Sequence, residues 1–135
     1  MSLVLDASVV MTWVLEAEVT RATDELMDRT GEAGAVVPAL WRLEVANVLQ
    51  MAVRRKRMTA ECRDVFLRSL EIMPIEIDDE TNIHAWATTL TLADRHGLTT
   101  HDAAYLELAR RRRLPLASLD ADLRAAAERV SILPA

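Results

Sequence analysis

Short apolar runs recur along this sequence, and one or more stretches of helical pattern separate each run from the next. A run of only a few apolar residues is too short for a helix and indicates a strand buried on both faces. Strands that alternate with helices form parallel sheets. The sequence therefore predicts an α/β fold in a single domain over residues 1–135, with a central parallel sheet of about five short strands flanked by helices. The predicted strands are Leu3–Leu5, Ala35–Val37, Ile72–Ile77, Leu114–Ser118 and Val130–Leu133.

The helical stretches between these runs carry recognisable start and stop residues. Thr59 and Asp120 each stand directly before a helical pattern, where an oxygen of the side chain can accept from the free backbone N–H groups. Asp78 or Asp79 is expected to cap the helix that Gly97 ends. The predicted helices span residues 9–15, 20–29, 39–55, 60–71, 79–96 and 101–112, with a short helix after Asp120.

Composition narrows the class of protein. Hydrophobic residues make up 51% of the chain, which fits a globular protein and excludes a disordered one. Cys62 is the single cysteine, so no internal disulfide is possible and a reducing, cytoplasmic setting is expected. The apolar segment from Leu3 to Leu15 is interrupted by Asp6 and has no basic segment before it. We therefore expect neither a signal peptide nor a membrane span there.

Charge is unevenly distributed along the chain. The formal net charge of −5, taken alone, argues against a nucleic-acid partner. Two basic runs, Arg54–Arg57 and Arg110–Arg113, nevertheless stand at the ends of predicted helices. Each run could contact phosphate, or it could stabilise the helix end through the helix dipole. The sequence leaves both interpretations open, and Arg42 and Arg95 are further candidates for phosphate contact.

Three carboxylates stand at strand ends or helix starts. Asp6 ends the first predicted strand, Asp120 follows the fourth, and Asp102 lies in the first turn of a helix. Ligands of parallel sheets bind beyond the carboxyl ends of the strands, so we expect these side chains to converge there. Taken singly, each has a simpler interpretation. Asp6 could form a turn, Asp102 could be favoured by the helix dipole, and Asp120 could be an N-cap.

Glu44 is a fourth acid, and its helical neighbours predict that it faces inward. The residues three and four positions away are Leu40, Trp41, Asn47 and Val48. A buried carboxylate must be paired, hydrogen-bonded or bound to a metal, and pairing with Arg42 or another arginine is the simple alternative. Four carboxylates at one mouth repel one another, and a hard divalent cation such as Mg²⁺ or Mn²⁺ relieves that repulsion.

Four segments carry these acids in a recognisable order. Leu3–Val9 reads LVLDASV, Val37–Leu49 reads VPALWRLEVANVL, Leu98–Ala109 reads LTTHDAAYLELA, and Leu116–Leu123 reads LASLDADL. In residue type, order and spacing they resemble the four blocks of PIN domains, and in detail those of VapC-type toxins. The resemblance covers essentially the whole chain.

The resemblance implies roles for individual residues. The residues implied as catalytic metal ligands are Asp6, Glu44, Asp102 and Asp120. Ser8 and Ser118 match hydroxyl positions that support the site, and Asp122 matches a position that is sometimes acidic. His101 stands where an aromatic residue is expected, and Ser118 stands where threonine is commoner. Neither departure removes a ligand.

The resemblance also implies an activity and partners. The implied protein is the toxin of a toxin–antitoxin pair, a Mg²⁺-dependent endoribonuclease that hydrolyses RNA phosphodiester bonds, with Mn²⁺ as a possible substitute. A VapB-type antitoxin would hold it inactive. The apolar surface of the predicted helix 39–55 fits a homodimer, a groove for an antitoxin helix, or ordinary burial. The alternatives left open are a PIN-fold RNA-processing nuclease without a toxin role and a PIN-fold binding module without catalysis.

The sequence disfavours two other classes of protein that have an aspartate after the first strand. A phosphatase of the haloacid dehalogenase type needs a second Asp where this sequence has Ser8. A response-regulator receiver needs a late lysine, and Lys56, the single lysine, lies at a helix end.

Overall fold

A parallel β-sheet forms the centre of the protein, in a computed structural model that describes residues 2–15 and 18–135. The strands are β1 (Leu3–Leu5), β2 (Ala35–Val37), β3 (Ile75–Ile77) and β4 (Leu116–Ala117). Their order in the sheet is β3-β2-β1-β4, and every pairing is parallel. The predicted α/β class with a parallel sheet is therefore confirmed.

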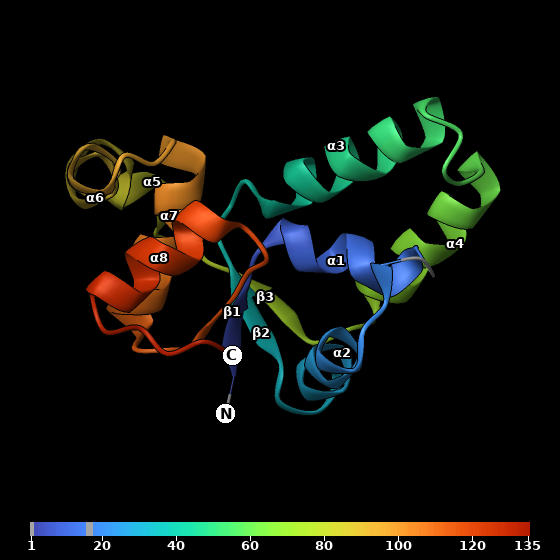
Figure 1. Ribbon diagram of the computed structural model, residues 1–135, viewed down its shortest axis with the longest axis horizontal. Helices are drawn as coiled ribbons and strands as arrows, with labels where there is room; N and C mark the ends of the chain where they lie inside the picture. The colour runs from blue at the N-terminus through green and yellow to red at the C-terminus, as the bar shows by residue number, and fades with distance from the viewer. Residues whose placement is uncertain (1, 16–17) are drawn as a thin grey trace.

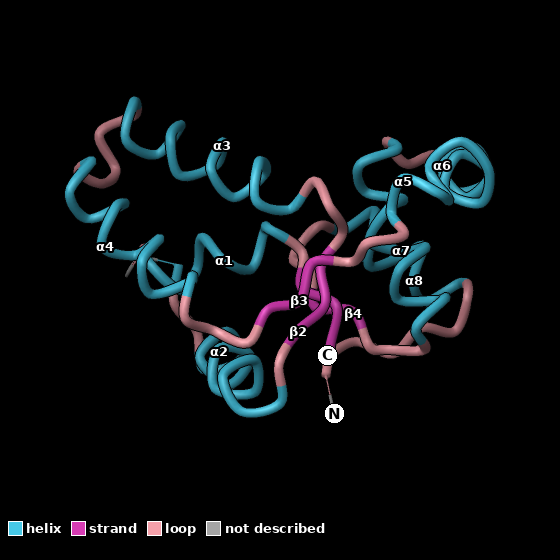
Figure 2. The backbone as a smooth tube through the Cα atoms, turned by 180° about the vertical axis from the view of Figure 1, so that it is seen from behind, coloured by secondary structure: helices cyan, strands magenta, loops and turns pink. Residues whose placement is uncertain are grey.

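Helices cover the sheet from two sides. They are α1 (Ala7–Val14), α2 (Arg21–Ala33), α3 (Trp41–Arg54), α4 (Ala60–Glu71), α5 (Thr81–His84), the π-helical turn η2 (Ala85–Thr89), α6 (Leu90–His96), α7 (Thr100–Arg112) and α8 (Ala121–Arg129). Figures 1 and 2 show α1 to α4 on one side of the strands and α5 to α8 on the other. None of the helices in the described part of the chain has the length and apolar character needed to cross a membrane.

One of the two inner strands, β1, leads directly into the site. β1 lies between β2 and β4, and Leu3, Val4 and Leu5 are completely buried. Burial of an aliphatic side chain of this size contributes about 1.5–3 kcal/mol. The chain leaves this buried strand at Asp6, and the register pairs Leu5 with Ala117 of β4. The carboxyl ends of β1 and β4 therefore lie side by side.

The fifth predicted strand, Val130–Leu133, is wrong. These residues close α8 instead: the backbone N–H of Ile132 donates to the carbonyl of Ala127 at 2.9 Å, and Ser131 is left-handed with φ of 62°. Backbone groups used in ending a helix are not free to pair with a strand. In the described ranges this segment reaches the sheet only at its end, where the carbonyl of Leu133 accepts from the N–H of Leu116 at 3.0 Å and the next residue, Pro134, forms an isolated parallel bridge with Leu116.

The third and fourth strands are shorter than predicted. Ile72 and Met73 belong to the end of α4, where the N–H of Met73 donates to the carbonyl of Leu70 at 3.1 Å. Pro74 then leads into β3, which lies at the sheet edge, as the proline predicts. The run Leu114–Ser118 contributes only its central pair, Leu116 and Ala117, to β4.

Of the four helix-end residues predicted from the sequence, three have that role in the structure and one does not. Thr59 accepts from the N–H of Cys62, Asp120 caps α8, and Gly97 ends α6 with φ of 65°. The helix predicted to start at Asp78 or Asp79 instead has Glu80 at its N-cap and is divided by η2. The carboxylate of Asp78 accepts from the side chains of Thr81 and Arg111.

Candidate functional site

The four acids predicted as ligands lie at helix starts that follow the carboxyl edge of the sheet. Asp6 is the N-cap residue of α1 directly after β1, and Asp120 is the N-cap of α8 after β4. Glu44 lies in the first turn of α3, and Asp102 lies in the first turn of α7. Helices that return across a parallel sheet begin where its strands end, so the topology directs all four toward one edge.

Asp6 is buried, and two serines hold one of its carboxylate oxygens. The hydroxyls of Ser8 and Ser118 both donate to Asp6 Oδ2 at 2.7 Å. The carboxylate makes no helix-capping hydrogen bond, and no side chain in the described ranges donates to its other oxygen, Oδ1. The simple interpretation of Asp6 as a local turn former therefore leaves its buried carboxylate unexplained.

The same serines connect the loop before α8 to Asp6. Ser118 Oγ accepts from the backbone N–H of Asp120 at 3.0 Å, and Ser8 Oγ accepts from the N–H of Leu119 at 3.0 Å. Each hydroxyl therefore accepts from the β4–α8 loop while it donates to Asp6. This arrangement fixes the position of Asp120 relative to Asp6.

Glu44 is half-buried and accepts a hydrogen bond from the hydroxyl of Tyr105. Its simple alternative partner, Arg42, forms an exposed ion pair with Glu71 instead. Tyr105 itself is completely buried, and burial together with the bond to Glu44 raises its pKa, so the phenol stays protonated and is the donor. Glu44 is thus held by a neutral hydroxyl and not neutralised by an arginine.

Electrostatic repulsion links the four carboxylates. Burial raises the pKa of Asp6, and the charge of Asp120 raises it further, against hydrogen bonds from the two serines. Burial also raises the pKa of Glu44, with added repulsion from Asp6 and Asp102. For Asp102, burial is again the largest cause of a raised pKa, followed by the charges of Asp120 and Asp6. Asp6, Glu44 and Asp102 therefore each feel the charge of at least one other acid of the set.

The remaining predicted residues lie at the margin of this site. Asp122 is exposed in the first turn of α8, and His101 is exposed at the start of α7. The positive charge of His101 lowers the pKa of Glu44 and of Asp102, although burial outweighs it at both. Asp120 does serve as an N-cap through Oδ2, which accepts from Leu123 N at 2.8 Å. That role occupies one of its two oxygens.

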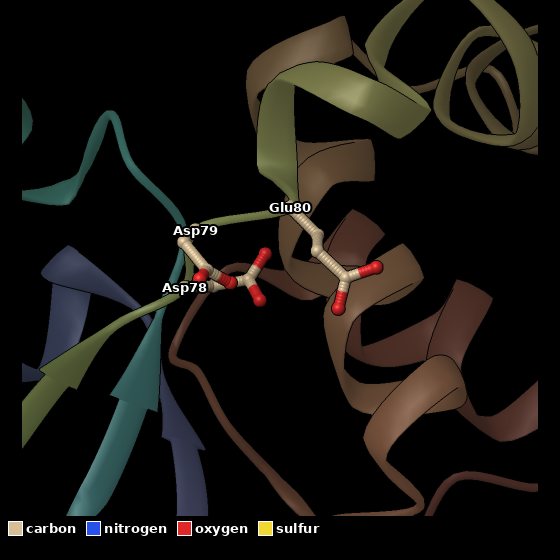
Figure 3. Close-up of side chains that lie close together, drawn as sticks. All are labelled: Asp78, Asp79 and Glu80. Carbon is tan, nitrogen blue, oxygen red and sulfur yellow. The ribbon is translucent and has the colours of Figure 1, made fainter.

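A second acidic cluster lies on the loop from β3 to α5. Figure 3 shows Asp78, Asp79 and Glu80, whose carboxylate oxygens lie within 4.8 Å of one another. Among the described residues the four predicted ligands form no group that tight. Arg111 compensates the second cluster, because it bonds both oxygens of Asp78 at 3.1 and 2.7 Å and lies 3.6 Å from Glu80. We therefore interpret this cluster as a structural ion-pair network.

Arg111 also bonds Glu107 on its own helix, at 2.8 Å. Sequence reasoning missed this network because Arg111 stands in a basic run, where each arginine has the same simple explanation. The detectable signal was Glu107, four residues before Arg111 on a helix whose other central residues are apolar. Arg112, next in the run, pairs with Glu76, so two of its four arginines are bound to acids of the protein.

Comparison with known protein families gives one match over most of the chain. A family model described as the PIN domain matches residues 3–129. The chain belongs to the PIN domain family. That match includes all four acids and both serines of the site, and the sequence resemblance to PIN domains is confirmed.

Solved structures resemble this PIN domain over nearly its whole length. PAE2754 from Pyrobaculum aerophilum superposes with a TM-score of 0.67 at 22% identity, covering 93% of this chain and 87% of that one. FitAcB from Neisseria gonorrhoeae superposes with a TM-score of 0.62 at 20% identity, covering 99% and 96%. At these identities the likeness supports the fold. A search of curated protein sequences gives no match.

Proposed function

We propose that this PIN domain is a metal-dependent endoribonuclease that hydrolyses RNA phosphodiester bonds. The proposed catalytic metal ligands are Asp6, Glu44, Asp102 and Asp120. One observation carries the proposal: no arginine or lysine of the described ranges pairs with any of these four carboxylates, and burial together with the charges of other acids of the set raises the pKa values of Asp6, Glu44 and Asp102. Structural acids are normally paired with cations, as Asp78 is with Arg111.

The donor set fits a hard divalent cation. All the donors are carboxylate oxygens, the type that Mg²⁺ and Mn²⁺ prefer. At Asp6 the two serines occupy Oδ2, so Oδ1 can face a cation without losing those bonds. Burial is the main cause of the raised pKa values of Asp6, Glu44 and Asp102, and a cation would remove the repulsion that adds to it. We therefore propose Mg²⁺ as the cofactor, with Mn²⁺ as a substitute.

The protein's own groups would position the reacting parts. A bound Mg²⁺ would supply polarisation of the phosphate and a lowered pKa for a water molecule. Ser8 and Ser118 hold Asp6 in place, so its carboxylate need not reorganise when substrate enters. The starts of α3, α7 and α8 bring the positive ends of three helix dipoles to the same edge, which favours an RNA phosphate there.

We extend the proposal to a biological role as the toxin of a toxin–antitoxin pair. Its support is the likeness of four sequence blocks, beginning with Leu3–Val9, to those of VapC-type toxins. In this role the chain would act as a single domain in the cytoplasm. Its partners would be an RNA substrate and a VapB-type antitoxin.

A homodimer is part of this proposal, and an exposed apolar stripe supports it. Ile83, Trp86 and Leu90 follow one another at spacings of three and four along α5, η2 and α6, and Trp86 is 93% exposed. Adjacent large apolar side chains on one helical face are unusual at a surface that stays in water. Sedimentation analysis of the wild type and Trp86→Glu tests this part, and a monomeric wild type refutes it.

Cleavage of RNA by the purified protein, free of any antitoxin, tests the central proposal. We expect cleavage with Mg²⁺ or Mn²⁺, loss of cleavage in excess EDTA, and recovery when the metal is restored. Asp6→Asn should remove cleavage, whereas the control Asp28→Asn, on the exposed surface of α2, should not. Cleavage that continues unchanged in EDTA, or in Asp6→Asn, refutes the proposal.

A further inference from the structure

A completely buried tyrosine on α7 contacts a proposed ligand on α3. The hydroxyl of Tyr105 donates to Oε1 of Glu44, across 61 residues of sequence. Tyr105 lies three positions after Asp102, so the two side chains lie on neighbouring parts of the same face of α7. One helix therefore supplies a proposed ligand, Asp102, and a hydrogen bond to another, Glu44.

The position of the Tyr105 hydroxyl is fixed from both ends of α7. At the start of the helix, Thr99 Oγ1 accepts from the N–H of Asp102 at 3.1 Å. Near its end, Arg111 bonds Asp78 in the loop after β3. The ring of Tyr105 is packed in the core and has no exposed surface. A side chain enclosed in this way has few alternative rotamers, so its hydroxyl is a rigid donor.

Glu44 is a flexible side chain without any other partner in the described ranges. A glutamate has three side-chain torsions, and fixing them costs conformational entropy. The hydrogen bond from Tyr105 to Oε1 selects one arrangement before any ligand binds, and Oε2 remains without a side-chain donor among the described residues. The entropy is then lost on folding and not on binding, which favours binding.

We propose that Tyr105 is a positioning residue of the metal site, whose hydroxyl holds Glu44 in the rotamer that binds the cation. This inference rests on the proposed function. Tyr105 does not touch the reacting atoms, and its effect passes entirely through Glu44. Partners of ligands in this position typically change metal affinity by about 10- to 100-fold when they are removed.

The test compares Tyr105→Phe with a matched loss of a buried hydroxyl elsewhere. Phenylalanine keeps the ring and removes only the donor. Thr30→Val is the control, because Thr30 is completely buried in α2 and donates to the carbonyl of Leu26 at 2.8 Å, far along the chain from the site. Affinity for Mg²⁺ is measured by calorimetry, and by the rise in melting temperature that Mg²⁺ produces.

We expect Tyr105→Phe to weaken Mg²⁺ binding by about 10- to 100-fold. Its cleavage rate should recover toward the wild-type value at saturating Mg²⁺, because the ligands themselves are intact. Thr30→Val should bind Mg²⁺ as the wild type does. Unchanged affinity in Tyr105→Phe, or an equal loss in Thr30→Val, overturns the inference and leaves the proposed function standing. A wild type that binds no Mg²⁺ overturns both.

A double-mutant cycle with Glu44→Gln tests whether Tyr105 acts through Glu44. If it does, Tyr105→Phe should cost little further Mg²⁺ affinity in the Glu44→Gln background, because the group that it positions no longer ligates as a carboxylate. Full additivity of the two losses overturns the inference. The cycle is read from binding, so it does not depend on residual cleavage.

Discussion

Replacing Arg111 by methionine should destabilise the protein strongly, whereas the same change at Arg112 should not. Arg111 is the cation for two buried carboxylates: Asp78 is 2% exposed and Glu107 is 4% exposed. Methionine fills most of the space but leaves both acids without their cation. Arg112 pairs with Glu76 at the surface, so it is the matched control from the next position in the chain.

The expected loss of stability in each variant follows from how deeply the acids paired with the arginine are buried. Removing one member of a buried ion pair costs about 3–5 kcal/mol, and losing an exposed pair costs about 0–1 kcal/mol. For 135 residues the entropy of unfolding is about 0.28 kcal/mol/K, from about 2.1 cal/mol/K per residue. Arg111→Met should therefore lower the melting temperature by roughly 10–18 °C, and Arg112→Met by no more than about 4 °C.

Lowering the pH should reduce the difference in stability between the wild type and Arg111→Met. Burial acts to raise the pKa of Asp78, but hydrogen bonds from Arg111 and Thr81 outweigh it, and the net pKa is lowered. An acid with a lowered pKa stabilises the fold above its ordinary pKa of 3.8, and this contribution disappears as the pH falls through the folded-state value. In the variant the hydrogen bonds from Arg111 are lost and the one from Thr81 remains, so burial has more effect and Asp78 takes up a proton more readily than in the wild type.

Urea unfolding of both variants at pH 7 and near pH 4 measures these effects. Equal losses in the two variants would show that burial of Asp78 and Glu107 does not control the cost. If the difference in stability between the wild type and Arg111→Met stays the same at pH 7 and near pH 4, Asp78 is not the charge that Arg111 compensates.

Three further predictions concern the proposed metal site. Asp6→Asn should abolish the growth arrest caused by expression in a bacterium, and an equally toxic variant would contradict the site or the role. Glu44→Gln and Asp102→Asn should each abolish cleavage. In EDTA the free energy of unfolding of each variant should be unchanged or higher by up to about 1 kcal/mol, because each substitution removes repulsion. A marked fall in melting temperature would mean that these acids hold the fold together. The metal-free wild type should lose stability as the pH rises above about 4, because Asp6, Glu44 and Asp102 have raised pKa values in the fold and keep protons that the unfolded chain releases. Melting curves across pH, with and without Mg²⁺, check this, and a stability that rises over that range contradicts it.

The sequence was sufficient for the parts of the fold that depend on local pattern. β1 and β2 are uniformly apolar, and their ends at Asp6 and Pro38 are marked by polar or proline residues. The positions of Asp6, Asp102 and Asp120 at strand ends or helix starts were predictable for the same reason. Glu44 was expected further inside its helix, and it lies in the first turn because α3 begins at Trp41. The predicted strand Val130–Leu133 was wrong because an apolar run that ends a helix has the same composition as a short strand.

Contacts between distant segments could not be predicted in this way. Asp78 and Arg111 are 33 residues apart, and Glu44 and Tyr105 are 61 apart. Neither pair has a spacing that singles it out, since both depend on how the helices pack on the sheet. Tyr105 was part of a sequence block, but its role became visible only when its hydroxyl was found at Glu44.

The bond from Ser118 to Asp6 joins residues 112 positions apart, and this has a consequence for folding. Pairing of β4 with β1 is among the most non-local contacts of the molecule, and non-local pairings form late and slowly. Asp120 is placed by that same pairing. A chain that is still being synthesised, or one in which β4 has not yet docked, therefore has no complete set of carboxylates. Under the proposed function, the metal site would be completed as one of the last events of folding, so partly folded molecules would not cleave RNA.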